Sequence, residues 1–403
     1  MTNVEKNISA QRRKKRSESE GDLNISHWRG DLHAHTRTDL SNPETPEEIV
    51  ERRRGSNCGV VPLGALVRYH AQEMRNEFIA ITDHSRDGDP EAALEGITKW
   101  FRGMYLKNED WLRENFQKTK QELSGEDIEQ IEAKARSNAE QLALYGDERL
   151  EDVFQEIDSL LGQEGVPIRV FKGIEANLLP DGSFDTEMID RGEFELVNCS
   201  IHPAVDSKGF APIVEDSDKY SDLTIKGIEH PKTNIICHMG FGCDREFIDE
   251  LQWAKIAEAA IENNVAIEVN IKPVIDCIYK EMLDYGKYPK NDIGYRDVFR
   301  KRLPALVPIL SSEKIKKVLG PYFERGLRIA INTDEHKAKF IKTEVTKDGA
   351  TEEFIKRDIR LWRCLKIVEE YFNGLFSELG INAENIINTY PQERLEQFMN
   401  KTA

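Results

Sequence analysis

Two histidines, His33 and His35, stand one residue apart near the end of segment 29–36, which is interpreted as a short strand. In a β-strand, residues i and i+2 point to the same face, so both imidazoles would converge on one point. Histidine is the commonest metal ligand among side chains, and a metal ion is the usual reason for two neutral imidazoles to meet. The alternative is a pair of surface histidines in a loop. The pair alone does not separate these two interpretations.

Other apolar segments of the chain also end in residues that can bind a metal. These residues are His84, Glu175, His202, His238, Asp334 and His336. A single histidine or aspartate after a strand is often a turn or helix-cap residue. Eight such residues at equivalent places favour one shared site, and they include six of the nine histidines. The other three, His27, His70 and His230, show no such placement. Imidazoles and carboxylates without thiolates fit Zn, Mn or Fe, and eight ligands require two or three ions.

Seven short apolar segments must position these residues. They cover 29–36, 78–84, 168–175, 194–202, 233–238, 265–270 and 327–336. Helical patterns lie between or after them, at 45–54, 61–74, 245–263, 315–325 and 354–376. Strands that alternate with helices predict a parallel sheet. Seven strands with polar ends favour a closed α/β barrel, in which the chemistry lies at the carboxyl ends of the strands.

Residues 90–163 differ in character from the rest of the chain, because they are highly charged and no proline stands between Pro90 and Pro167. Apolar residues recur there at helical spacing, which predicts two or three helices inserted after the second strand. Trp100, Phe101 and Tyr105 have two interpretations. Packing in the core of this insertion is favoured over lining a substrate entrance.

The remaining segments complete the expected domain organisation. Residues 1–26 are polar and are expected to form a disordered tail, in which the basic run 12–16 is interpreted as solvated rather than as a nucleic-acid-binding arm. The barrel domain is expected over 27–380, including the insertion. Residues 381–403 are expected to form a C-terminal helical tail.

Composition narrows the class of protein. The 403 residues are 39% hydrophobic and 32% charged, which is typical of a chain with a sizeable core and a charged surface. The net charge of −17 argues against non-specific nucleic-acid binding by the whole surface. The sequence has no apolar run long enough for a transmembrane helix and no secretory signal. Its six cysteines form no CxxC pair, which predicts reduced thiols in a cytoplasmic protein.

The strand-end motifs resemble those of the PHP (polymerase and histidinol phosphatase) superfamily, in type, order and spacing, over roughly residues 29–340. The matching motifs are His33-Ala34-His35, Thr82-Asp83-His84, Gly173-Ile174-Glu175, Ser200-Ile201-His202, Cys237-His238 and Thr333-Asp334-Glu335-His336. The resemblance implies a distorted (β/α)7 barrel with a trinuclear metal centre. It implies that the eight residues are ligands and that Glu175 is the bridging carboxylate. Two departures from the family pattern are Thr333 and Glu335, which replace the commoner serine and small residue.

The resemblance also implies a ninth ligand shortly after the histidine pair. Asp39 is the nearest candidate, although Ser41 stands closer to the expected place. Arg37 follows the pair directly and is the preferred candidate for binding a substrate phosphate. Lys172, Lys208 and Lys272 are weaker candidates, for which a plain surface position is the alternative.

Three functions remain open within the resemblance. The favoured one is a metal-dependent phosphoesterase that hydrolyses a phosphomonoester, like histidinol phosphatases or nucleotide phosphatases, with a metal-activated hydroxide. Glu175, His202, Asp334 and His336 would be its catalytic residues, and a small phosphorylated molecule or a nucleotide its substrate. The second is a PHP-type exonuclease or phosphodiesterase acting on nucleic-acid ends, which would need a basic groove. The third is a non-catalytic scaffold, which loss of ligands would mark.

Overall fold

The structure is a computed structural model of the whole chain. It describes residues 28–36, 62–84, 90–144, 146–162, 166, 168–192, 194–202, 204–206, 209–211, 214–274, 276–277, 301–334, 341–346, 349–354 and 359–401. The expected N-terminal tail and the helix expected at 45–54 lie outside these residues.

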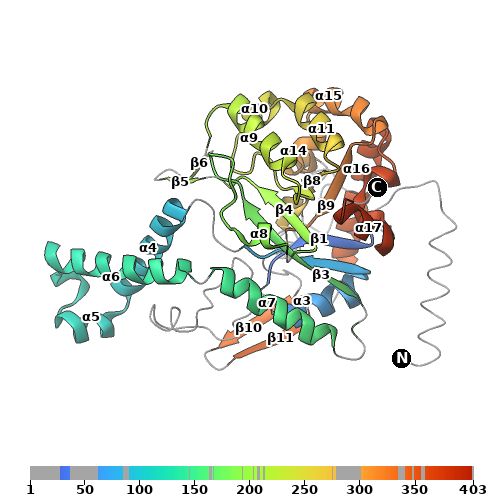
Figure 1. Cartoon of the computed structure of the whole chain (residues 1–403). Coiled ribbons are helices and arrows are strands. Elements are labelled where there is room, and N and C mark those ends of the chain that lie inside the picture. Colours follow the sequence, from blue (N-terminus) through green and yellow to red (C-terminus); the bar gives the residue numbers. More distant parts are fainter. Residues whose placement is uncertain are drawn as a thin grey trace, which may run out of the picture.

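A seven-stranded parallel sheet forms the centre of the molecule (Figure 1). Its strands are β1 (Gly30–Ala34), β2 (Phe78–Ile81), β3 (Arg169–Asn177), β4 (Leu196–Ser200), β7 (Ile235–Ile236), β8 (Ala266–Asn270) and β9 (Arg328–Asn332). The order in the sheet is β1-β2-β3-β4-β7-β8-β9, and each hydrogen-bonded pair is parallel. The expected parallel sheet of seven strands is therefore confirmed.

Side chains join the two edge strands, β1 and β9, and nearly close the barrel. The backbone N–H of Leu32 donates to Oδ1 of Asn332 at 3.1 Å. The hydroxyl of Thr333 donates to Asp31, whose other oxygen accepts from the N–H of His33 at 3.0 Å. Asn388 adds a third link, because its amide donates to the carbonyl of Gly30 at 3.1 Å and to Oδ1 of Asn332 at 3.0 Å.

Helices cover the outside of the sheet. Those following β3 are α8 (Met188–Arg191), α9 (Ser217–Glu229), α10 (Arg245–Glu250), α11 (Trp253–Glu262), α14 (Pro308–Ser311), α15 (Glu313–Glu324) and α16 (Ile359–Leu379). Asp216, Asp244 and Ser312 cap α9, α10 and α15 by accepting a backbone N–H of the first turn. The helix expected at 245–263 is two helices, because Leu251 adopts an extended conformation between them.

Smaller elements complete the fold. Before β2 lie α3 (Leu63–Tyr69) and the π-helix η2 (His70–Met74), where one helix was expected. Two hairpins pair β5 (Ala204–Asp206) with β6 (Gly209–Ala211) and β10 (Ile341–Thr346) with β11 (Gly349–Phe354). The helix expected from 354 begins later, at Ile359, because Phe354 ends β11.

The expected insertion lies between β2 and β3 (Figure 1). Its first three α-helices share a core of their own, whereas its last helix packs on the core of the barrel. Where two or three helices were expected, it consists of four α-helices and a 3-10 helix, namely α4 (Pro90–Lys107), α5 (Glu109–Phe116), η3 (Lys120–Glu122), α6 (Gly125–Leu144) and α7 (Gly146–Leu161). Phe101 and Tyr105 are fully buried in a cluster with Leu112 and Ile131. Asn138 donates to the Tyr105 hydroxyl at 2.6 Å. Core packing is therefore confirmed for these two aromatic residues. The side chain of Trp100 is outside the described part.

The C-terminal segment packs into one end of the barrel. It contains η5 (Ala383–Asn385), η6 (Ile387–Thr389) and α17 (Gln392–Met399). The apolar residues of η6 and α17 share a buried cluster with inward-facing residues of the strands, namely Leu32, Phe78, Ala80, Phe171, Leu196, Ile235, Ala266 and Ala330. Asn388 contacts the start of β1, and Asn234, just before β7, donates to the carbonyl of Met399 at 2.8 Å. The segment expected as a helical tail thus fills the amino-terminal end of the barrel.

Two simple expectations concern membranes and thiols. Among the described residues, no helix has the length and apolarity to cross a membrane. The cysteines whose side chains the structure describes, Cys199, Cys237, Cys243 and Cys277, are free thiols. A cytoplasmic location stays a prediction.

Candidate metal centre

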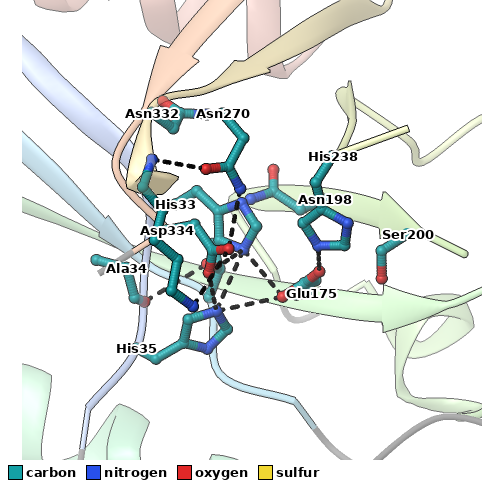
Figure 2. A network of polar contacts seen from close by, with 12 residues as sticks. His33, Ala34, His35, Glu175, Asn198, Ser200, His238, Asn270, Asn332 and Asp334 are labelled. Carbon is teal, nitrogen blue, oxygen red and sulfur yellow. Dashed lines mark hydrogen bonds and ion pairs between the residues drawn. The ribbon is translucent and has the colours of Figure 1, made fainter. Parts of the chain in front are cut away.

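The carboxyl end of the barrel brings together seven of the predicted residues, and Figure 2 shows His33, His35, Glu175, His238 and Asp334 among them. They are His33, His35, His84, Glu175, His202, His238 and Asp334. All except His202 are buried, and 27% of the His202 side chain is exposed. Parallel strands place their carboxyl ends at one rim, so residues far apart in sequence meet there.

Glu175 lies at the centre of the cluster, and each of its two carboxylate oxygens faces its own group of histidines. Three Nε2 atoms lie near Oε2, those of His33 at 2.9 Å, His35 at 3.2 Å and His84 at 3.2 Å. Two lie near Oε1, those of His238 at 2.6 Å and His202 at 3.6 Å. A carboxylate divided in this way between two ligand groups is suited to bridging two ions.

Asp334 completes one of these groups. Its Oδ1 lies 3.4 Å from Nε2 of His35 and 3.7 Å from Nε2 of His33. The two imidazole Nε2 atoms are themselves 3.2 Å apart. A tetrahedral ion with bonds of about 2.0 Å holds its ligand atoms about 3.3 Å from one another. The side chains therefore fit a metal ion without rearrangement.

The hydrogen bonds around the cluster orient the rings with Nε2 inward. Nδ1 of His33 donates to Oε1 of Glu268 at 2.7 Å, and Nδ1 of His84 donates to the carbonyl of Glu175 at 2.9 Å. Nδ1 of His202 hydrogen-bonds to Oδ1 of Asn177. Each bond places the ring proton on Nδ1 and leaves the Nε2 lone pair for a metal, which is how outer partners tune metal-binding histidines.

Glu268 was not predicted as a site residue, although it is fully buried and central to this network. Its Oε1 accepts from His33 and from the amide of Asn332 at 3.0 Å, and its Oε2 accepts from the backbone N–H of His238 at 2.8 Å. The sequence carries one signal for it. Glu268 is a charged residue inside the apolar run 265–269, and a buried charge requires partners.

Two further acids hold the first and third strands in place. Both oxygens of Asp83 accept from Thr36, at 2.8 Å from its N–H and 2.7 Å from its hydroxyl. Oδ1 of Asp83 also lies 3.6 Å from Nδ1 of His35. Asp185 accepts from the side-chain amide of Asn177 at 2.6 Å, and Asn177 orients His202. These contacts fix the rings before any ligand binds.

The electrostatics of the cluster favour an ionised carboxylate beside the histidines. Burial opposes the charge of Glu175, but His84, His33 and His238 outweigh it and hold the pKa of Glu175 well below its usual value. Burial lowers the pKa of His202 to about 3, so its ring is neutral. Burial also disfavours a charged His33, but Glu268 and Glu175 raise its pKa well above the usual value. A cation at this position would take over the role of that proton.

The backbone is strained at two of the cluster residues. His238 has a φ of 22° and Asp334 a φ of 47°, a region that side chains other than glycine rarely adopt. Each of them stands two positions after the end of a strand, His238 after β7 and Asp334 after β9. Such strain persists where the surroundings enforce it, and it concentrates at functional sites.

Six further residues were predicted as ligands or as phosphate-binding residues. Arg37, Asp39, Lys208 and His336 lie outside the described residues, so their predicted roles stay predictions. Lys172 lies on the outer side of β3, where its Nζ pairs with Asp158 of α7 at 2.7 Å. Lys272, by contrast, follows β8, and its Nζ lies 3.8 Å from Oδ2 of Asp334. Asn270 donates to the same oxygen at 2.9 Å.

The comparisons with known proteins agree with this picture in outline. The chain is similar to the DNA polymerase/3'-5' exonuclease PolX of Bacillus subtilis (strain 168), with 27% identity over 230 residues. The aligned part is 56% of this chain and 32% of the relative, so the chain matches about a third of that protein's length. No family model matches the sequence. The chain is therefore an α/β protein with a cluster of side chains that could hold metal ions. Over somewhat more than half of its length it is similar to a DNA polymerase/exonuclease.

Proposed function

We propose that this protein is a metal-dependent hydrolase of phosphoester bonds, of the PHP type that its motifs resemble. One observation carries the proposal, which is the division of five imidazole Nε2 atoms between the two oxygens of Glu175. Clustered divalent ions, Zn, Mn or Fe, would polarise the phosphoryl oxygens and lower the pKa of water.

The residues of the chain would hold and orient the reacting groups. Glu175 and Asp334 would hold the ions together with the histidines, and burial would keep bulk water away from the inner side of the cluster. His202 is the one ligand candidate among the described residues with a partly exposed side chain, so the substrate would enter over it. His336 would complete the set if it follows the family pattern.

Lys272 is a described candidate for binding the substrate phosphate. Its side chain is 32% exposed at the rim of the cluster, and its ammonium group lies 3.8 Å from Asp334. A cation in that position would attract a phosphate oxygen beside the ions. Arg37, which the sequence favours for this role, lies outside the described residues and stays a candidate beside Lys272.

Two substrate classes fit this site. A phosphomonoester, such as histidinol phosphate or a nucleoside monophosphate, carries fewer negative charges than a nucleic acid, so a net charge of −17 disfavours it less. The end of a nucleic acid fits the similarity to PolX, whose name includes a 3'-5' exonuclease. A non-catalytic scaffold is disfavoured, because the seven described ligand candidates converge at one place.

The test uses the full-length protein, stripped with a chelator and reloaded with Mn²⁺ or Zn²⁺. It would be assayed on p-nitrophenyl phosphate, histidinol phosphate, nucleotides and labelled single-stranded DNA. We expect turnover that depends on added metal and is abolished in His33→Ala but retained in His230→Ala, whose ring lies outside the cluster beside Phe184. Absence of metal-dependent turnover on all of these substrates would refute the proposal. Turnover that survives in His33→Ala would place the site elsewhere.

A further inference from the structure

Phe241 is an exposed aromatic residue at the edge of the metal-binding cluster. It is 44% exposed, and Leu161 is the other large hydrophobic residue that is exposed in the described part of the chain. Leu161 ends α7, away from the cluster, whereas Phe241 follows His238 by three residues. Its ring centroid lies 5.4 Å from that of His238 and 6.4 Å from that of His202. The exposed ring thus lies beside the most open part of the site.

The loop that carries Phe241 is fixed by tight turns. The N–H of Phe241 donates to the carbonyl of His238, and the N–H of Cys243 donates to the carbonyl of Gly240, both at 2.9 Å. The N–H of Gly240 donates to the hydroxyl of the buried Tyr220 at 3.0 Å.

Gly240 shows that this loop has little freedom to adopt another conformation. It has a φ of 72°, and a Cβ there would lie 2.6 Å from Cγ1 of Ile248. Only glycine fits such a position without strain. The chain therefore holds an apolar ring in a fixed position where much of it contacts water. Packing in the hydrophobic core does not explain this position.

We propose that Phe241 is a specificity-determining residue that stacks against a nucleobase of the substrate. This inference rests on the proposed phosphoesterase function and names its substrate class, a nucleotide or a nucleic-acid end. A sugar separates a nucleobase from its phosphate. The ring centroids of Phe241 and His202 lie 6.4 Å apart. At this separation one nucleotide could place its phosphate at the cluster and its base on Phe241.

The chemistry of the ring favours a base over an aliphatic group. Every nucleobase has a flat π face, and stacking on aromatic side chains is a recurrent way of binding single strands and nucleotides without sequence preference. His202 meets the Phe241 ring at an interplanar angle of 82°, so the histidine approaches Phe241 with crossed ring planes rather than stacking on it. Lys272, following the neighbouring strand β8, would hold the phosphate at the same rim.

The first test measures stacking directly in the full-length, Zn²⁺-loaded protein. A 2-aminopurine nucleoside monophosphate and an oligonucleotide with a 3'-terminal 2-aminopurine serve as two separate probes, because stacking on an aromatic ring quenches this base. We expect saturable quenching with wild type, at least tenfold weaker binding in Phe241→Ala, and binding close to wild type in Phe241→Tyr. Tenfold corresponds to about 1.4 kcal/mol, within the range for one base on an aromatic ring.

The second test uses catalysis and matched substrates. Nucleoside monophosphate is compared with ribose 5-phosphate, and an oligonucleotide with its analogue lacking the 3'-terminal base. We expect Phe241→Ala to lower kcat/KM for the base-containing member of the preferred pair by about tenfold relative to the base-free member. The pair that responds shows whether the base belongs to a free nucleotide or to a nucleic-acid end. Leu161→Ala is the control, as a second exposed hydrophobic residue outside the site.

The outcomes separate this inference from the proposed function. Hydrolysis by wild type with equal effects of Phe241→Ala on base-containing and base-free substrates would overturn the role of Phe241 and leave the phosphoesterase intact. Quenching that requires Phe241, without hydrolysis of any substrate, would support nucleobase binding and overturn the phosphoesterase. Equal quenching in wild type and Phe241→Ala would overturn the inference in either case.

Discussion

Glu268 accepts a hydrogen bond from Nδ1 of His33 at 2.7 Å, although 235 positions separate the two residues in the chain. The carboxylate comes from β8 and the imidazole from β1, and both side chains are fully buried. This contact sets the tautomer of His33 and directs its Nε2 toward Glu175. It makes Glu268 a positioning residue for the proposed metal centre.

The first prediction is that Glu268→Gln weakens metal binding about 10- to 100-fold, the usual cost of removing an outer partner of a metal ligand. The amide can donate to Nδ1, so it no longer enforces the metal-binding tautomer. Competition with a chromophoric chelator would measure the affinity for Zn²⁺. Activity should return at high metal concentration. Glu258→Gln is the matched control, because Glu258 pairs with Arg325 at the surface. Unchanged affinity in Glu268→Gln would contradict this role.

The second prediction concerns metal removal. A ligand that binds only the folded state at 100 times its Kd stabilises that state by about 2.7 kcal/mol. For a chain of 403 residues, with an unfolding entropy of about 2.1 cal/mol/K per residue, the stabilisation should raise Tm by roughly 3 °C. Thermal melts with and without Zn²⁺ would measure the shift, which should largely disappear in His33→Ala and persist in His230→Ala. An equal shift in all three proteins would mean that the metal binds elsewhere.

The third prediction concerns closure of the barrel. Asn388→Ala removes the donors to Gly30 and Asn332 and the acceptor for the N–H of Ile331 at 2.6 Å. Each buried group left without a partner costs about 1–3 kcal/mol. We therefore expect the free energy of unfolding in urea to fall by at least about 2 kcal/mol.

Asn115→Ala provides the comparison for this measurement. Asn115 lies on the exposed side of α5 and donates only to the carbonyl of Trp111. Its replacement should change the free energy of unfolding by no more than about 0.5 kcal/mol. Similar losses in both variants would show that Asn388 has no special role in joining β1 to β9.

The fourth prediction is a pH dependence that comes from His70, outside the cluster. Burial lowers the pKa of His70 to about 3, from the ordinary 6.5. Between these values the unfolded chain binds a proton that the folded protein does not. The stability is therefore complete above pH 6.5 and falls with decreasing pH, by up to about 1.4 kcal/mol per unit.

His70→Gln should remove this contribution. Urea unfolding of both proteins in a chelator, from pH 7 to pH 4.5, would measure it, because the other titrating groups are common to the pair. We expect the wild type to lose more stability than the variant as the pH falls. Parallel curves would show that His70 is protonated equally in the two states.

Much of the site could be predicted from residue types and their local spacing. His33 and His35 alternate along a strand, and a strand directs such residues to one face whatever surrounds it. The ends of the other strands could be located in the same way, because short apolar runs and parallel alternation are local properties of a sequence. These properties predicted both the sheet and the convergence of its carboxyl ends.

Only the tertiary structure decided which residues support that convergence. In the sequence, Glu268 is an isolated charge in an apolar strand. Only the structure places it beside His33. Asn388 reads as part of a polar C-terminal segment until it links β1 to β9. Phe241 carries no functional signal in the sequence, and only the structure of the loop after β7 places it beside His202. The physical reason is that hydrogen bonds and exposure depend on partners that are distant in the chain, up to hundreds of positions away, and local periodicity carries no information about those partners.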